Sequence, residues 1–267
     1  MRVYLSGPQG SWRPEMEGHH LLVSFAEARQ IKLLAAGWDV PGWLVDSGAF
    51  TAWTKGRPID LDAYIAFLVD LEAQAAAGAL VLDGYLALDV IPGEPGRLPT
   101  EDEARWATGK SLENLAKMRA AGLSPIPIFH EGEPMDLLDA YVAEGHNVIA
   151  LGATASRGKP ELVDWLQPIF DRYPGQRFHG LAMTQRRVIE GFPFDSVDST
   201  TWLNFCRFGL KANKHLLEGH DSAFYRRLGI QAIENIPRCR EIQKTANIYA
   251  LDDAAQQLNL FADDVGA

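Results

Sequence analysis

Short apolar segments alternate with segments of helical period along the chain, and this alternation predicts an α/β fold. The chain has 267 residues, of which 47% are hydrophobic, enough to bury one large core. A (β/α)₈ barrel of the TIM type needs about 250 residues. The sequence therefore predicts a single-domain barrel over residues 1–250, followed by an acidic C-terminal tail over residues 251–267. A doubly wound open sheet is the alternative, although no G-x-G-x-x-G motif follows the first strand.

Seven candidate strands are mostly apolar on both faces until their last residues, as is typical of parallel strands covered by helices. They are VYLSG (3–7), WLVDSG (43–48), GYLALDV (84–90), PIPIFH (125–130), NVIALG (147–152), RFHGLA (177–182) and FDSVDS (194–199). We expect the eighth strand either near the start of the chain or in CRFGLKA (206–212).

The segments between these strands have helical features. Residues 61–78 carry an apolar stripe with helical spacing, formed by Leu61, Tyr64, Ile65, Leu68 and Leu71. Thr100 followed by Glu103 predicts a capping box, and Gly122 predicts the end of the same helix. Two further helices are expected in MDLLDAYVAEG (135–145) and ELVDWLQPIFDRY (161–173).

Charge and composition exclude several classes of protein. The formal net charge is −10, which argues against a general nucleic-acid coat protein. Cys206 and Cys239 are too few for a disulfide framework or a zinc knuckle, so we expect two reduced thiols and no metal. No apolar run reaches the roughly 18 residues that cross a bilayer, and no secretory h-region is visible. The expectation is a soluble, cytoplasmic protein that does not bind membranes.

Polar residues fall where the apolar runs end, which in such a barrel is the rim that carries the chemistry. These strand-end residues are Asp46, Ser47, Gly48, Asp89, His130, Gly152, His179, Gly180 and Asp198. A single strand-end aspartate is commonly a helix cap or a turn residue, and His130 alone is more typical of a core histidine. Three carboxylates on separate strands are harder to explain in this way, because burying them together is costly unless they are paired or functional.

The last predicted strand holds two aspartates that have different expected roles. Side chains alternate along a strand, so Asp195 and Asp198 should point to opposite faces. Asp198 lies at the C-terminal end and is the candidate for chemistry. Asp195 lies near the start of the strand, where we expect a structural salt bridge or a turn.

Six of these segments, in this order, resemble the tRNA-guanine transglycosylase superfamily of barrel enzymes. They are LVDSGAF (44–50), LALDVIPG (86–93), PIFHEG (127–132), IALGAT (149–154), FHGLAMTQ (178–185) and SVDSTTW (196–202). The likeness covers most of residues 1–210 and is greatest to the short phage and bacterial branch that inserts 7-deazaguanines into DNA. It implies an enzyme that exchanges guanine in DNA for a 7-deazaguanine (preQ0-like) base, in the host cytoplasm if the protein is phage-encoded.

The resemblance also implies roles for individual residues. Asp198 would be the nucleophile that forms a covalent glycosyl-enzyme intermediate, and Asp46 the general acid and base. Asp89 would accept hydrogen bonds from the purine. The remaining substrate-binding candidates are Ser47, Gly48, Phe50, His130, Gly152, His179 and Gly180. Phe50 and Trp53 are candidates to sandwich the ring, although core packing suits either equally well.

Two features depart from the tRNA-modifying enzymes. Their Cys₃His zinc site cannot be built from two cysteines, so neither a metal nor another cofactor is expected. The chain also lacks an obvious RNA-binding appendage. A local excess of basic residues after the site, including Arg207, Lys211 and Lys214, would contact the DNA backbone or else form an ordinary solvated helix face.

Two other functions remain open from the residues. One is a nucleoside or glycoside hydrolase that uses two carboxylates and water. The other is a non-catalytic barrel that binds nucleotides. The oligomeric state is not predicted.

Overall fold

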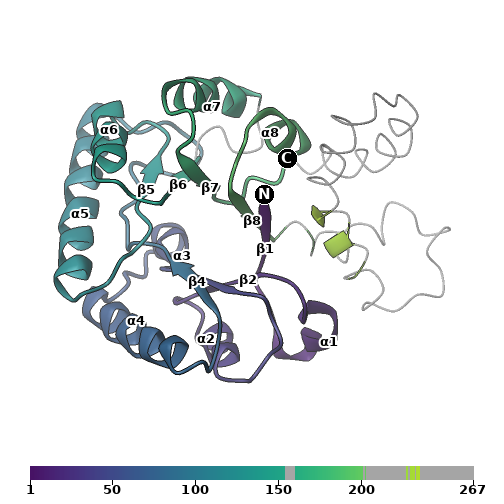
Figure 1. Cartoon of the computed structure of the whole chain (residues 1–267). Coiled ribbons are helices and arrows are strands. Elements are labelled where there is room, and N and C mark those ends of the chain that lie inside the picture. Colours follow the sequence, from purple (N-terminus) through teal and green to yellow (C-terminus); the bar gives the residue numbers. More distant parts are fainter. Residues whose placement is uncertain (154–159, 201, 203–226, 228, 232, 235–267) are drawn as a thin grey trace, which may run out of the picture.

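The computed structural model describes residues 1–153, 160–200, 202, 227, 229–231 and 233–234 of the chain, which form one parallel sheet with helices outside it (Figure 1). The sheet has eight strands in the order β4-β3-β2-β1-β8-β7-β6-β5. Each strand thus lies beside its neighbours in sequence, and the first lies beside the last. The strands are β1 (Arg2–Ser6), β2 (Leu21–Ser24), β3 (Trp43–Asp46), β4 (Leu82–Tyr85), β5 (Ile128–His130), β6 (Val148–Gly152), β7 (Arg177–Gly180) and β8 (Ser196–Ser199).

The two edge strands of this sheet meet and close it into a barrel. Leu86 and Ile126 form a parallel bridge just beyond β4 and just before β5. The backbone N–H of Ile126 donates to the carbonyl of Tyr85 at 2.9 Å, and Ala87 N–H donates to the carbonyl of Ile126 at 2.8 Å. The predicted (β/α)₈ barrel is therefore confirmed, and the open doubly wound sheet is wrong.

The eighth strand is β2, near the start of the chain, as one of the two expectations had it. The other candidate, residues 206–212, lies outside the described residues, as does the predicted acidic tail. Most strands are shorter than predicted. The segment over residues 84–90 pairs as a strand only up to Tyr85, apart from the Leu86 bridge, and its later residues line the mouth of the barrel.

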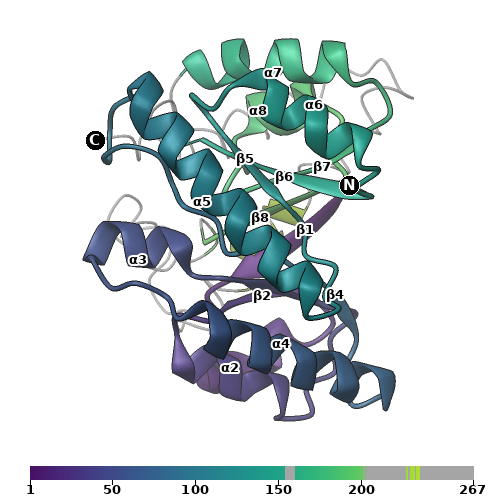
Figure 2. The same cartoon turned by 90° about the vertical axis from the view of Figure 1, so that its left-hand side faces the viewer.

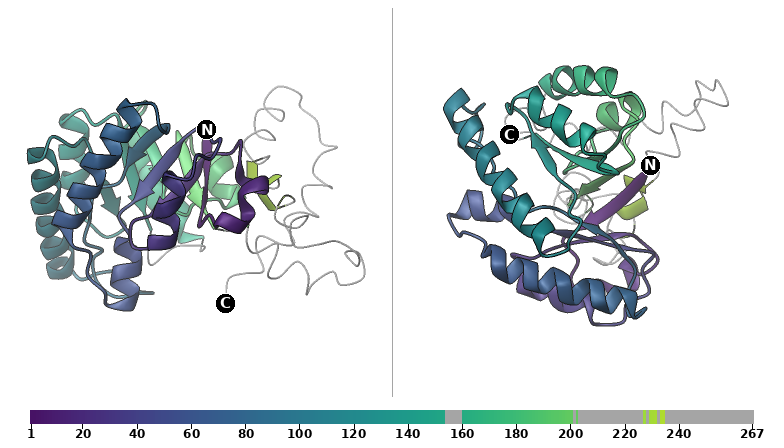
Figure 3. Two further views of the ribbon diagram at one scale, coloured as in Figure 1. Left: turned by 90° about the horizontal axis from the view of Figure 1, so that it is seen from below. Right: turned by 60° about the vertical axis from the view of Figure 1, so that its left-hand side comes forward.

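The helices form a layer around the outside of the barrel, as the turned views in Figures 2 and 3 show. They are α1 (Arg13–Met16), α2 (Ala28–Leu34), α3 (Ala49–Lys55), α4 (Leu61–Ala76), α5 (Glu101–Ala120), α6 (Met135–Ala143), α7 (Glu161–Arg172) and α8 (Arg186–Gly191), with a 3₁₀ turn over Gly10–Trp12. The four helices predicted from the sequence are all present. The capping box at Thr100 is confirmed, and Gly122 follows α5 with a positive φ of 85°.

Apolar side chains fill two separate spaces. The larger core lies between the strands and the helices, where α4 buries Tyr64, Leu68 and Leu71 from its predicted stripe. The interior of the barrel holds two small apolar clusters, formed by Tyr4, Leu22 and Leu44, and by Leu86, Ile128 and Ala150. Because these clusters plug the middle of the barrel, the polar groups inside it gather at its two ends.

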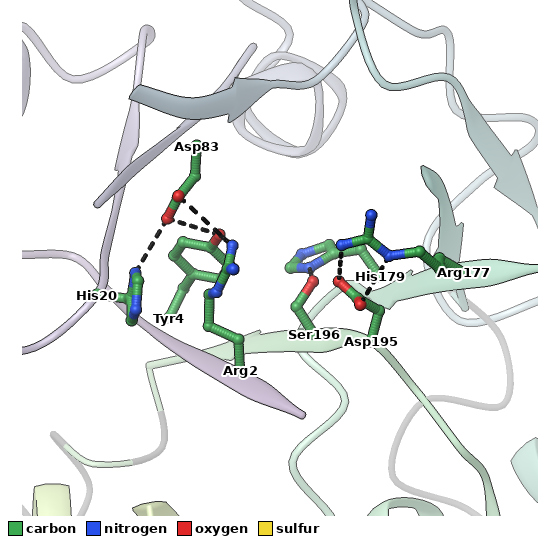
Figure 4. A network of polar contacts seen from close by, with 8 residues as sticks. All are labelled: Arg2, Tyr4, His20, Asp83, Arg177, His179, Asp195 and Ser196. Atoms are coloured by element: carbon green, nitrogen blue, oxygen red, sulfur yellow. Dashed lines mark hydrogen bonds and ion pairs between the residues drawn. The ribbon is translucent and has the colours of Figure 1, made fainter. Parts of the chain in front are cut away.

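The N-terminal end of the barrel is held by a polar network (Figure 4). Asp83 accepts a hydrogen bond from the hydroxyl of Tyr4 at 2.9 Å and contacts His20 at 2.9 Å. Arg2 lies 3.5 Å from the same carboxylate. Polar contacts at this end of such barrels are typically structural, whereas active sites in barrel enzymes lie at the C-terminal ends of the strands. No helix of the described part of the chain is long and apolar enough to cross a membrane.

Candidate functional site

A cavity of ≈ 370 Å³ opens at the C-terminal ends of the strands. Three aspartates predicted from the sequence line it together: Asp46 at the end of β3, Asp89 in the loop after β4, and Asp198 on β8. Predicted residues that also line it are Phe50, His130 and Gly152. The side chains that converge here come from distant parts of the chain, as the strand-end pattern predicted.

Asp198 is the most firmly held of the three carboxylates and is only 7% exposed. Ser6 donates its hydroxyl to Oδ2 at 2.7 Å, and the backbone N–H of Ala182 donates to Oδ1 at 2.9 Å. His179 Nε2 lies 3.3 Å from Oδ1. Burial alone would raise the pKa of Asp198, but the contacts with His179, Ala182 and Ser6 outweigh it and leave that pKa below its ordinary value. Asp198 is therefore ionised at neutral pH.

Asp46 lies in the same cavity but in the opposite electrostatic situation. Burial raises its pKa to about 7, and repulsion from Asp89 and Asp198 adds to the effect. Contacts with Ser24 and with the N–H of Gly48, which donates to Oδ2 at 3.0 Å, oppose the shift only in part. A carboxyl group with such a pKa can both give and take a proton near neutral pH.

Asp89 and His130 form a buried pair. Oδ2 of Asp89 lies 2.5 Å from Nε2 of His130, and each side chain is 4% exposed. Burial by itself lowers the pKa of His130, but its contact with Asp89 outweighs burial and raises that pKa above the ordinary value. The backbone N–H of His130 donates to Glu133 at 2.7 Å, so the histidine is fixed from two sides.

Within the described part of the chain, Oδ1 of Asp89 is buried and has no hydrogen-bond partner. A buried acceptor without a partner is unfavourable unless a ligand or water supplies the donor. Asp89 lines the cavity, and an N–H group of a bound molecule is one donor that would satisfy this oxygen.

At two of the predicted glycines, a side chain would clash with neighbouring atoms. Gly48 has a φ of 88°, and a Cβ there would lie 2.4 Å from the Cβ of Ala26. Gly152 lies against His130, where a Cβ would come within 2.6 Å of Nδ1. A larger residue at either position would displace the loop after β3 or the Asp89–His130 pair.

Four predicted substrate-binding residues do not line this cavity: Ser47, Gly48, His179 and Gly180. Ser47 is fully buried, and its hydroxyl accepts from the N–H of Ala49 at 3.3 Å. His179 is 1% exposed and lies beneath Asp198 inside the barrel. Gly180 faces the outer core, where a Cβ would meet Met183 and Phe194 at 3.0 Å.

The two aromatic candidates, Phe50 and Trp53, lie in different cavities. Phe50 lines the rim of the cavity and is 47% exposed. Trp53 instead lines a neighbouring cavity of ≈ 700 Å³, which also contains Trp106 and shares Asp89 with the first. The indole N–H of Trp53 donates to the carbonyl of Gly93 at 2.8 Å, so the tryptophan is fixed in place there.

Sequence reasoning missed several residues that support the site. Ser6 lies at the end of β1, and the same strand-end rule that identified the aspartates would have found it. Ser196 and Ala182 gave no such signal, since their contacts depend on strand pairing and on a turn. Ala182 has a φ of 54° and is the one described residue other than glycine with a positive φ.

The other predicted residues are Asp195 and the basic residues that follow the last strand. Asp195 makes the expected structural salt bridge, with both carboxylate oxygens bound to Arg177 at 2.8 and 3.0 Å (Figure 4). Arg207, Lys211 and Lys214 lie outside the described residues, so the expected contact with a nucleic-acid backbone has no structural account. No cluster of His, Cys, Asp and Glu that suits a metal ion occurs among the described residues.

Comparison with known proteins does not identify a family for this chain. No protein-family model matches the sequence, and no curated protein is significantly similar to it. Solved structures that it resembles include a candidate fructose-1,6-biphosphate aldolase from Coccidioides immitis, with 11% identity, a TM-score of 0.48 and coverage of 89% of each chain. Another is a mutant tryptophan synthase alpha-subunit from Pyrococcus furiosus, with 10% identity, a TM-score of 0.44 and coverage of 86% of this chain and 96% of the other.

Proposed function

We propose that this protein is a base-exchange transglycosylase that replaces guanine in DNA with a 7-deazaguanine through a covalent aspartyl-glycosyl intermediate. The observation that carries the proposal is the pair Asp46 and Asp198. They share one cavity, and their surroundings move their pKa values in opposite directions. Pairs of titratable groups with separated pKa values mark the acid and the base or nucleophile of an enzyme.

The first half of the reaction uses Asp198 in its ionised form. An oxygen of its carboxylate attacks C1′ of the guanine nucleotide as the bond from C1′ to the base breaks. Protonated Asp46 transfers its proton to the departing guanine. The products are a glycosyl ester of Asp198, free guanine and an ionised Asp46. The transition state is oxocarbenium-like, and the nearby negative charge stabilises it.

The second half reverses these roles. The incoming 7-deazaguanine gives the proton of its ring nitrogen to Asp46 and attacks C1′. The ester bond breaks, and Asp198 leaves as a carboxylate. Both aspartates return to their starting protonation states, so the cycle needs neither a cofactor nor a metal.

Recognition of the base is assigned to Asp89. Its free Oδ1 suits an N–H group of guanine or a 7-deazaguanine, and His130 holds the other oxygen. The cavity of ≈ 370 Å³ lies in the size range of small-molecule sites. Phe50 lines the cavity and is 47% exposed, so its ring could pack against a base or a sugar.

The choice of DNA as acceptor rests on the resemblance of the sequence segments to the DNA-modifying branch. The target base would have to leave the duplex stack, because C1′ inside a duplex does not reach a cavity at a barrel mouth. A single-stranded or flipped guanine meets this requirement.

Intact mass spectrometry tests the proposal. The protein is incubated with a guanine-containing DNA oligonucleotide, and the mass of the protein is measured before and after addition of a 7-deazaguanine base. We expect a protein–DNA adduct that maps to the peptide containing Asp198, and incorporation of the added base. Release of guanine without incorporation would favour a hydrolase. Binding without adduct or release would favour a non-catalytic nucleotide-binding barrel.

A further inference from the structure

We propose that His179 is a positioning residue that orients the carboxylate of Asp198 and keeps it ionised from beneath the cavity. This inference rests on the proposed role of Asp198 as the nucleophile. His179 itself touches no ligand, because it does not line the cavity. Its effect would act only through Asp198.

The position of His179 follows from the register of the last two strands. His179 on β7 pairs with Ser196 on β8, two residues before Asp198. Side chains two residues apart on a strand share a face, so Ser196 and Asp198 both point into the barrel at successive depths. His179 therefore enters the barrel one layer below Asp198, and its Nε2 comes within 3.3 Å of Oδ1.

The opposite ring nitrogen is fixed as well. Nδ1 of His179 lies 2.9 Å from the hydroxyl of Ser196 (Figure 4). A serine hydroxyl can donate to Nδ1, which leaves the ring proton on Nε2. Nε2 lies 3.3 Å from Oδ1 of Asp198, although the contact is not aligned as a hydrogen bond. The ring of Tyr4 packs edge-on at 5.9 Å, and its hydroxyl is bound by Asp83. The imidazole is thus held on three sides.

The three groups that hold Asp198 are not equivalent. Ser6 and Ala182 line the cavity, whereas His179 contacts Asp198 from beneath it. Asp46 and Asp89 face Asp198 across the cavity as further carboxylates. Among these described neighbours, His179 is the side chain that contacts Asp198 without lining the cavity, so it can act on the nucleophile without touching the substrate.

The test compares His179→Leu with His179→Gln. Leucine removes the contact, whereas the amide of glutamine can place a donor near the position of Nε2. The pKa of Asp198 is measured by NMR titration of isotope-labelled aspartate carboxyls, assigned with Asp198→Asn. His20→Leu is the matched control, since His20 is another barrel-interior histidine but contacts Asp83 rather than Asp198.

We expect His179→Leu to raise the pKa of Asp198 by about one unit or more, and His179→Gln and His20→Leu to leave it near the wild-type value. In the base-exchange assay at pH 6, where Asp198 should stay ionised in all these proteins, His179→Leu should lower kcat by about 10-fold or more without changing KM, because the carboxylate loses its orientation, and glutamine should restore most of it. An unchanged pKa in folded His179→Leu overturns the proposal.

A second variant tests the role of His179 if the first does not fold. If His179→Leu does not fold, Ser196→Ala replaces it, because loss of the Nδ1 partner should also raise the pKa of Asp198; an unchanged value there overturns the proposal. The titration needs no substrate. A wild-type protein without exchange activity would therefore reject the proposed function, while the titration still decides the role of His179.

Discussion

Asp46 and Asp198 line one cavity from strands that are separated in the sheet by β2 and β1, and their pKa values shift in opposite directions. The difference comes from their partners. Asp198 has two hydrogen-bond donors and a histidine, whereas Asp46 is buried near two other carboxylates. One residue is prepared to remain charged and the other to exchange a proton near neutral pH.

The first prediction concerns the pH dependence of guanine release. Release needs Asp46 protonated, so its rate should fall about tenfold per pH unit above the Asp46 pKa of about 7. Because the pKa of Asp198 is lowered, the rate should stay level from near pH 7 down to the ordinary carboxyl range. Single-turnover release between pH 4 and 9 measures this. Asp46→Asn should lower the pH-independent rate of guanine release about 10²–10⁴-fold and remove the fall in rate above pH 7. If the rate still falls above pH 7 in this variant, Asp46 is not the group that protonates guanine.

The second prediction concerns stability. The raised pKa of Asp46 means that the folded protein binds its proton more tightly than the unfolded chain does. Protonation of Asp46 therefore contributes fully to the free energy of unfolding below pH 4, and this contribution is lost as the pH rises to about 7. Asp46→Asn should be more stable than the wild type by about 1–3 kcal/mol at pH 8, with little difference near pH 4. Urea unfolding at several pH values measures the difference, and a gain independent of pH would reject the explanation.

The third prediction separates the two aspartates of β8 and the turn before it. Asp198→Asn should abolish the covalent adduct and lower exchange more than about 1,000-fold. Asp195→Asn is the matched control, because Asp195 binds Arg177 at the other end of the strand. Its partly exposed ion pair should cost less than about 1 kcal/mol, with activity retained. Equal loss of activity in both variants would exclude Asp198 as the specific nucleophile.

The fourth prediction tests the Asp89–His130 pair by a double-mutant cycle. His130→Leu leaves the carboxylate of Asp89 buried without its partner, which should cost about 3–5 kcal/mol. Asp89→Leu combined with His130→Leu should cost at least about 1 kcal/mol less than the sum of the single changes. Urea unfolding of the four proteins gives the coupling. Additive losses would show that the two side chains act independently.

The fifth prediction concerns the strained turn after β7. Ala182→Gly keeps the N–H that donates to Asp198 and removes the Cβ from a backbone with φ of 54°. Strain relief of about 1–2 kcal/mol exceeds the entropic cost of glycine, so stability should rise by up to about 1 kcal/mol with activity retained. Ala73→Gly on the exposed face of α4 is the control and should lose about 1 kcal/mol. A similar loss in Ala182→Gly would show that the turn carries no strain.

The sequence by itself predicted the barrel and the gathering of acidic residues at the C-terminal ends of its strands. Alternating apolar strands and amphipathic helices encode a parallel sheet covered by helices, and the ends of parallel strands must meet at one rim. For this reason Asp46, Asp89 and Asp198 could be placed together before any coordinates. Strand alternation also indicated a structural role for Asp195, either a salt bridge or a turn, and the structure shows the salt bridge with Arg177.

Only the tertiary structure decided how deep each side chain lies and what surrounds it. His179 and Asp198 both end apolar runs, but the pairing of His179 with Ser196 puts the histidine one layer lower, under the cavity. That register depends on the stagger of the closed barrel, which local sequence does not encode. The opposite pKa shifts of Asp46 and Asp198 likewise arise from burial and from partners contributed by other strands.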